Sequence, residues 1–147
     1  MKREVVSVPV GAPLEDAAEK MNHHRVGCVV IVRDDRPVGV ITERNFVRLF
    51  SSSRGKKDGV KVDEFIPRHL VQLSSQATYA QAVRVFNRHG IKRVPVVENG
   101  RMVGILSQKD LLDYSRRAFL ALLEKNRQLQ GEVYRDFVVT GAALGAF

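Results

Sequence analysis

The sequence predicts a mixed α/β (α+β) protein of two tandem β-α-β-β-α repeats packed sheet to sheet, with a long C-terminal helix. Positions 36–46 and 101–111 carry matching apolar, glycine and hydroxyl residues, and the spacing of 65 residues persists back to Val6 and Val71. Within each copy, segments whose apolar residues recur with the period of a helix alternate with short β-branched runs. One copy of this size buries too little surface to be secure alone, so we expect the two copies to share a core.

Each repeat opens with a short apolar strand, predicted at 5–8 and 70–73, followed by a helix at 14–24 and 79–89. Pro13 suits a helix start because its missing N–H leaves no unsatisfied donor there. Ser75 is the preferred cap of the second of these helices, with Thr78 as the alternative.

A hairpin follows in each copy, with strands at 28–32 and 38–41, and again at 94–97 and 103–106. Asn99-Gly100 between two apolar runs is a strong hairpin signal. Pro95 has no N–H for a strand ladder, which predicts an edge or a strand start.

The last helix of each repeat begins at Thr42 or Ser107. Each hydroxyl lies three residues before Asn45 or Asp110, so it can cap that helix.

The predicted domains are residues 1–60, 61–115 and 116–147. A polar, glycine-bearing linker occupies 51–60, and a short helix at 62–66 leads into the second repeat. The last helix continues to about Gln130 with one apolar stripe, which either packs on its own domain or contacts a second copy or another protein. The tail from Val133 to Phe147 could follow it into such an interface.

Composition limits the partners and the compartment. The formal net charge of +8 favours anionic partners such as nucleotides, nucleic acid or a membrane surface. The single cysteine, Cys28, lies in an apolar run and forms no intrachain disulfide, which suits a cytoplasmic location. No signal peptide and no run of 18 apolar residues is visible, so we expect no spanning helix, and a membrane is not among the expected partners.

The segments VGVITERNF (38–46) and VGILSQKDL (103–111), with GIKRVPVV at 90–97, resemble the CBS-domain signature of Gly, two apolar residues, Ser or Thr, two variable residues and Asp. The motif occurs twice in register, and the resemblance covers about residues 1–115. It implies a stand-alone CBS pair, or Bateman module, that binds an adenosine ligand between its copies. AMP is the expected ligand, with ADP or ATP as alternatives and S-adenosylmethionine less favoured. Such pairs commonly form homodimers and regulate another protein without catalysing a reaction.

In the second repeat, the carboxylate of Asp110 could accept hydrogen bonds from both ribose hydroxyls. Ser107 lies where a helix N-terminus can bind phosphate, with Lys109 beside it. Lys92 and Arg93 would face the same cleft if the family arrangement holds. Adenine is expected against apolar strand residues, namely Val71 and 94–96, with Pro95 among them.

The first repeat departs from the motif. Asn45 replaces the Asp, and Gly27 and Cys28 stand where the second repeat has Lys92 and Arg93. We therefore expect weak binding or none at this cleft, although Thr42 and Arg44 remain. Arg44 could instead reach the phosphates in the other cleft, and the residues of both motifs could also serve only as helix caps.

Other activities find little support in the sequence. It contains no phosphate-binding loop and no nucleophile elbow, and its four histidines lack the spacing of metal ligands, so we expect no catalytic residue and no metal site. Two alternatives remain open: a basic protein that binds nucleic acid, and a dimerisation scaffold without a ligand. In the linker, Arg54, Lys56 and Lys57 are either solvated or bind phosphates or an acidic partner.

Overall fold

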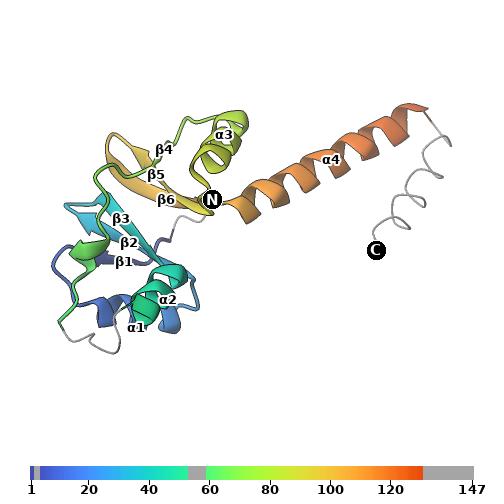
Figure 1. Cartoon of the computed structure of the whole chain (residues 1–147). Coiled ribbons are helices and arrows are strands. Elements are labelled where there is room, and N and C mark those ends of the chain that lie inside the picture. Colours follow the sequence, from blue (N-terminus) through green and yellow to red (C-terminus); the bar gives the residue numbers. More distant parts are fainter. Residues whose placement is uncertain (2–3, 53–58, 131–147) are drawn as a thin grey trace. The chain divides into compact units, whose positions relative to one another are not determined.

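The computed structural model describes residues 1, 4–52 and 59–130 of the chain (Figure 1). The structure divides into two units. The first, Met1–Gln108, contains both sheets, and the second begins at Lys109. The predicted succession β-α-β-β-α occurs twice, which confirms the fold class.

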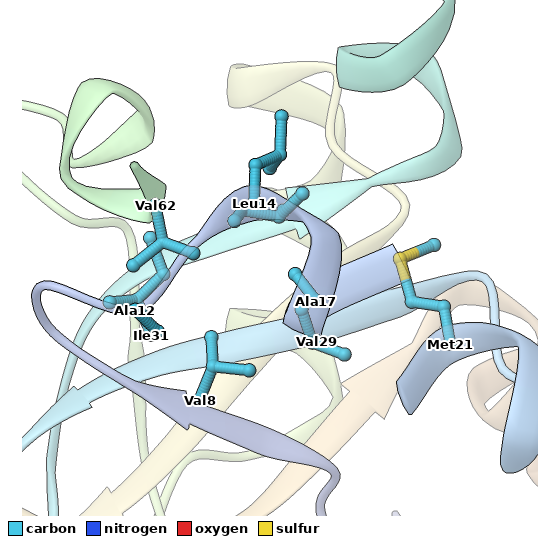
Figure 2. Close-up of a cluster of buried hydrophobic side chains, with 9 residues drawn as sticks. Val8, Ala12, Leu14, Ala17, Met21, Val29, Ile31 and Val62 are labelled. Atoms are coloured by element: carbon cyan, nitrogen blue, oxygen red, sulfur yellow. The ribbon is translucent and has the colours of Figure 1, made fainter. Parts of the chain in front are cut away.

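The first repeat consists of β1 (Ser7–Pro9), α1 (Leu14–His23), β2 (Cys28–Arg33), β3 (Arg36–Thr42) and α2 (Glu43–Ser52). Strand β2 is central: it pairs with β1 in parallel and with β3 antiparallel. Side chains from β1, α1 and β2 gather into one buried cluster that includes Val8, Ala17 and Val29 (Figure 2).

The second repeat consists of β4 (Leu73–Ser74), α3 (Tyr79–His89), β5 (Arg93–Glu98), β6 (Arg101–Ser107) and α4 (Gln108–Gln130). Its sheet has the same topology, with β5 between a parallel β4 and an antiparallel β6. The buried residues Ala82 and Phe86 of α3 and Val94 and Val96 of β5 repeat the pattern of the first copy.

The two hairpin turns have the positive φ angles that tight turns between twisted strands need. These angles are 49° and 62° at Asp34 and Asp35, and 50° and 77° at Asn99 and Gly100. The turn of the first repeat also contacts the second sheet, because the Asp35 carbonyl accepts a hydrogen bond of 3.0 Å from the Met102 N–H. Strands β3 and β6 lie against each other, so the two sheets meet as predicted.

The segment after the linker completes the core of the first repeat. The predicted short helix is the 3₁₀ helix η1 (Val62–Phe65), and Val62 is fully buried in the first cluster (Figure 2). The Leu14 N–H donates to the Val60 carbonyl at 2.9 Å, and the Asp63 carboxylate accepts a bond of 2.6 Å from the Gly11 N–H. Linker residues 53–58, with Arg54, Lys56 and Lys57, lie outside the described residues.

Thr78, and not the preferred Ser75, caps α3. The Thr78 hydroxyl accepts from the Gln81 N–H at 3.3 Å, and the Gln81 side chain accepts from the Thr78 N–H at 2.8 Å. This reciprocal capping box requires a glutamine or glutamate three residues after the cap. Ser75 still follows the sheet, where its N–H donates to the Val97 carbonyl at 2.8 Å.

Pro95 does not lie in an edge strand, because β5 is the central strand of its sheet. The proline is tolerated because the neighbouring β4 does not pair with this position. In the first repeat, Val30 occupies the equivalent position and its N–H donates to the Val6 carbonyl at 3.0 Å. Pro95 has no N–H for the equivalent bond to Val71, and β4 pairs only with Val96 and Val97. Strand β4 is therefore one residue shorter than β1, and it lies at Leu73–Ser74 and not at the predicted 70–73.

Helix α4 (Gln108–Gln130) runs without interruption through the predicted domain boundary at 115. Residues 131–147 lie outside the described residues, so the helix end expected near Gln130 stays a prediction. None of its described side chains is buried. Large apolar side chains are among the exposed ones, including Leu112 at 69%, Phe119 at 53% and Leu122 at 56%. The tail from Val133 to Phe147 lies outside the described residues.

Candidate ligand-binding site

Three of the predicted ligand residues converge where β5 begins and β6 ends. Arg93 pairs directly with Ser107 across the two strands. The Lys92 carbonyl accepts a hydrogen bond of 3.0 Å from the Gln108 N–H, which fixes the entry to β5 beside the start of α4. Ser107 and Arg93 are half-buried, whereas Lys92 is exposed. Polar groups from two distant segments thus meet at one end of the second sheet.

Beside this end of the sheet, Pro95 changes the hydrogen bonding of Val71. The equivalent carbonyl in the first repeat, Val6, accepts from a strand N–H, but Pro95 provides no such donor for Val71. Val71 is half-buried and precedes β4, while Pro95 is fully buried. The Val71 carbonyl therefore keeps an acceptor position that its counterpart uses within the sheet.

Asp110 and Lys109 lie in the first turn of α4, directly after Ser107. Asp110 is half-buried and Lys109 is exposed. Both belong to the unit that begins at Lys109, so their contacts with a ligand stay predictions.

In the first repeat, Asn45 serves the start of α2. Its Oδ1 accepts from both the N–H and the hydroxyl of Thr42, at 2.9 and 2.7 Å. These bonds satisfy a backbone donor that a helix N-terminus leaves open. Arg44 is exposed beside them. Asn45 thus has the capping role that the sequence left open, whereas the Thr42 hydroxyl donates in this bond instead of accepting from a helix N–H.

The side chain of Arg93 crosses to the first repeat. Its Nη1 donates to the Gly27 carbonyl at 3.3 Å, a contact between residues 66 positions apart. A Cβ atom on Gly27 would lie 2.9 Å from Arg93 Nη2 and 3.0 Å from Glu43 Oε2. From the sequence, Gly27 indicated only that the first repeat lacks a cation present in the second, and Glu43 was not predicted as a site residue. A cation from the second repeat in fact lies against that glycine.

The described residues of the first repeat line three open grooves considered in turn. One of about 860 Å³ is lined by the segment before and within β1 and by the end of α1, with Val6, Lys20 and Val26 among its residues. The Lys20 ammonium donates to the Ser7 carbonyl there, at 2.7 Å. Val6 and Val26 are the repeat counterparts of Val71 and Ile91, so this groove corresponds to the predicted adenine side of the second repeat. Its volume is in the range of small-molecule sites.

Glu43 and Asn45 are close in sequence, but they line two different grooves. One of about 520 Å³ lies between α1 and α2 and includes Gly27 and Glu43. One of about 390 Å³ lies between α2 and the η1 segment and includes Asn45 and Arg48. The structure therefore assigns Asn45 and Glu43 to different surfaces.

Over the described part of the chain, no group of three or more His, Cys, Asp or Glu side chains could hold a metal ion. No described helix is long and apolar enough to cross a membrane. Cys28 is buried in β2, as expected for a core residue.

The family model of the CBS domain matches residues 1–52 and 62–117, which are the two repeats. The chain belongs to the CBS-domain family. The uncharacterized protein MK0525 of Methanopyrus kandleri is 31% identical to this CBS pair over 137 residues, covering 90% of this chain and 68% of that protein.

Two solved structures are similar to this CBS pair. The CBS-domain containing protein ATU1752 from Agrobacterium tumefaciens is 27% identical, with a TM-score of 0.69 over 77% of this chain and 90% of that one. The CBS domain pair of protein MJ0100, solved with 5′-methylthioadenosine and S-adenosyl-L-methionine, is 18% identical, with a TM-score of 0.69 over 80% of this chain and 93% of that one. At 18% identity the second likeness shows the fold alone.

Proposed function

We propose that this CBS pair is a regulatory module that binds an adenosine ligand, with AMP preferred, in a cleft of its second repeat and acts on a separate protein. The family and the convergence of Lys92 and Ser107 at one end of the sheet support a ligand site there. The observation that carries the proposal is the Val71 carbonyl, for which Pro95 offers no strand donor.

The exocyclic amine of adenine is the donor that suits the Val71 carbonyl. Val71, which is half-buried, also provides apolar surface for the base, whereas the predicted contact with Pro95 is limited because that residue is fully buried. The ribose hydroxyls would donate to the Asp110 carboxylate, and a phosphate would lie at the start of α4 against Ser107 and Lys109. The amine, the ribose hydroxyls and the phosphate of the ligand then each have a partner of matching chemistry.

The proposed pair assembles as a homodimer through the exposed apolar side chains of its helices. Val47 and Phe50 on α2 are 66% and 58% exposed, and Leu112 and Leu122 on α4 are similarly exposed. Within each helix taken by itself, exposed apolar side chains of this size favour an interaction surface. We place the regulated protein and the homodimer in the cytoplasm, and we propose no catalytic step.

Calorimetric titration with AMP, ADP, ATP, S-adenosylmethionine and 5′-methylthioadenosine tests the ligand site. The two variants compared are Asp110→Ala and its repeat counterpart Asn45→Ala. One adenosine ligand is expected to bind at about micromolar strength, near −8 kcal/mol. Asp110→Ala should remove most of that affinity, whereas Asn45→Ala should leave it unchanged because Asn45 caps α2.

Absence of binding to the folded protein at millimolar ligand would refute the sensor function. The exposed stripe of α4 would then favour a ligand-free scaffold. A steep salt dependence of binding to DNA or RNA would instead support the nucleic-acid alternative.

A further inference from the structure

The first helices of the two repeats carry opposite charges at equivalent positions. Residues 65 positions apart correspond, so Glu19 in the middle of α1 has Arg84 in the middle of α3 as its counterpart. Both side chains are exposed. Both positions are helical, so the local fold dictates neither charge.

Each of these helices presents one sign of charge on its outer surface. On α3 the exposed Arg84 and Arg88 form a surface called here the basic face, and the chain contains no Asp or Glu from residue 65 to residue 97. The surface of α1 called here the acidic face consists of three exposed carboxylates, Glu15, Asp16 and Glu19.

The charges of the two faces have no partner within the described part of the chain. None of these side chains forms an ion pair or a side-chain hydrogen bond there. The nearby Lys20 is engaged with the backbone, because its ammonium donates to the Ser7 carbonyl at 2.7 Å. Both faces are therefore available to a partner of opposite charge.

Like charges repel each other within each face. Glu15 and Glu19 lie one helical turn apart, and so do Arg84 and Arg88, a spacing at which like charges destabilise a helix. The helix dipole compensates an acid in the first turn and a base in the last turn. Glu19 and Arg84 lie outside both terminal turns of their helices and receive no such compensation. A surface of opposite charge would offset the repulsion in both faces.

We infer that the two faces bind each other between two copies of the chain, so that the acidic face of each copy lies against the basic face of the other. Charge complementarity selects this occupant, because an identical chain supplies the complement of both faces at once. A reciprocal contact of this kind closes with two copies and leaves neither face open.

This inference rests on the homodimer of the proposed function and specifies its orientation. Helix α2 lies beside α1 along the groove of about 520 Å³ and adds the exposed apolar side chains of Val47 and Phe50 to the contact. Apolar burial supplies affinity, whereas charges at the rim determine which surfaces meet. The opposite orientation, with α1 against α1 and α3 against α3, would place like charges together.

Sedimentation equilibrium of the full chain tests this orientation through an exchange of charges. The dissociation constant of the dimer is measured for the natural protein, for Glu19→Arg, for Arg84→Glu and for the two changes combined. Arg68→Glu changes an exposed residue outside both helices and is the control for the reversal of one charge. Circular dichroism verifies that each variant is folded.

Each single variant should weaken the dimer by about tenfold. An attraction becomes a repulsion at both symmetric contacts, although each exposed pair is weak by itself. The combined variant should recover most of that loss, since opposite charges face each other again, and Arg68→Glu should dimerise like the natural protein. Added salt should weaken the natural dimer and strengthen the dimers of the single variants, in which like charges meet.

A combined variant that dimerises no better than the single ones would overturn the pairing of the two faces. So would single variants that dimerise as tightly as Arg68→Glu; if Leu122→Glu still dissociated that dimer, the homodimer would stand and only its orientation would fall. Failure of the homodimer itself looks different, because the natural protein would then sediment as a monomer. Neither Glu19 nor Arg84 is a predicted ligand residue, so calorimetry with AMP tests the ligand site independently.

Discussion

Because Arg93 contacts Gly27, we expect Gly27→Ala to destabilise the natural protein and to stabilise a protein that lacks the Arg93 side chain. Gly27→Ala places a Cβ 2.9 Å from Arg93 Nη2, closer than real contacts allow, so the guanidinium must move. Its hydrogen bond to the Gly27 carbonyl is 3.3 Å long and half-buried. Loss of a charged bond of this kind costs about 1.5 kcal/mol, at the low end because water screens it.

A second effect of Gly27→Ala has the opposite sign. The φ of Gly27 is outside the left-handed region, so alanine fits the backbone and stabilises the fold by about 0.5 kcal/mol through the unfolded chain. The net expectation is a destabilisation of about 1 kcal/mol in the natural protein. With Arg93→Ala already present, the same change should stabilise by about 0.5 kcal/mol.

The assay is urea unfolding of the four proteins in this double-mutant cycle, with midpoints compared at equal slope. Glu43 provides the control, because its carboxylate also lies 3.0 Å from the new Cβ. Equal effects of Gly27→Ala with and without Arg93 would refute the reasoning. If the cost disappeared only in the Glu43→Ala protein, the clash would belong to Glu43 and not to Arg93.

Three further predictions address the other contacts. Pro95→Val should restore the strand N–H toward Val71, protect that amide from hydrogen exchange and weaken adenosine binding by about tenfold; unchanged affinity would exclude the Val71 carbonyl as a ligand contact. Asn45→Ala should lower the free energy of unfolding by about 1 kcal/mol through its two lost bonds to Thr42, measured by urea unfolding, and an unchanged midpoint would contradict the capping role. Leu122→Glu should shift a homodimer to monomer in sedimentation while its far-ultraviolet circular dichroism stays the same; an unaltered sedimentation coefficient would exclude α4 from the dimer contact.

Local features of the fold were predictable because neighbouring residues determine them. The 65-residue repeat, the order of elements and the Asn99-Gly100 turn all follow from periodicity and turn chemistry. The choice between Ser75 and Thr78 also depended on a local signal, the glutamine at position 81, which the sequence interpretation did not weigh.

The candidate site was predictable in part for the same reason. The family resemblance indicated Ser107, Lys92 and Arg93, and strand pairing does bring them to one end of the sheet. Repeat equivalence could not indicate where the Arg93 side chain goes, since that depends on the absence of a side chain at Gly27 in the other copy.

By itself, the sequence determined that this protein is a CBS pair with two unequal copies. The tertiary structure decided which residues complete each copy: Val62 fills the first core from beyond the linker, and Arg93 contacts the first repeat from the second. Periodicity and capping are encoded over a few residues, whereas the contacts of Val62 and Arg93 join positions far apart in the chain and exist only in the folded protein.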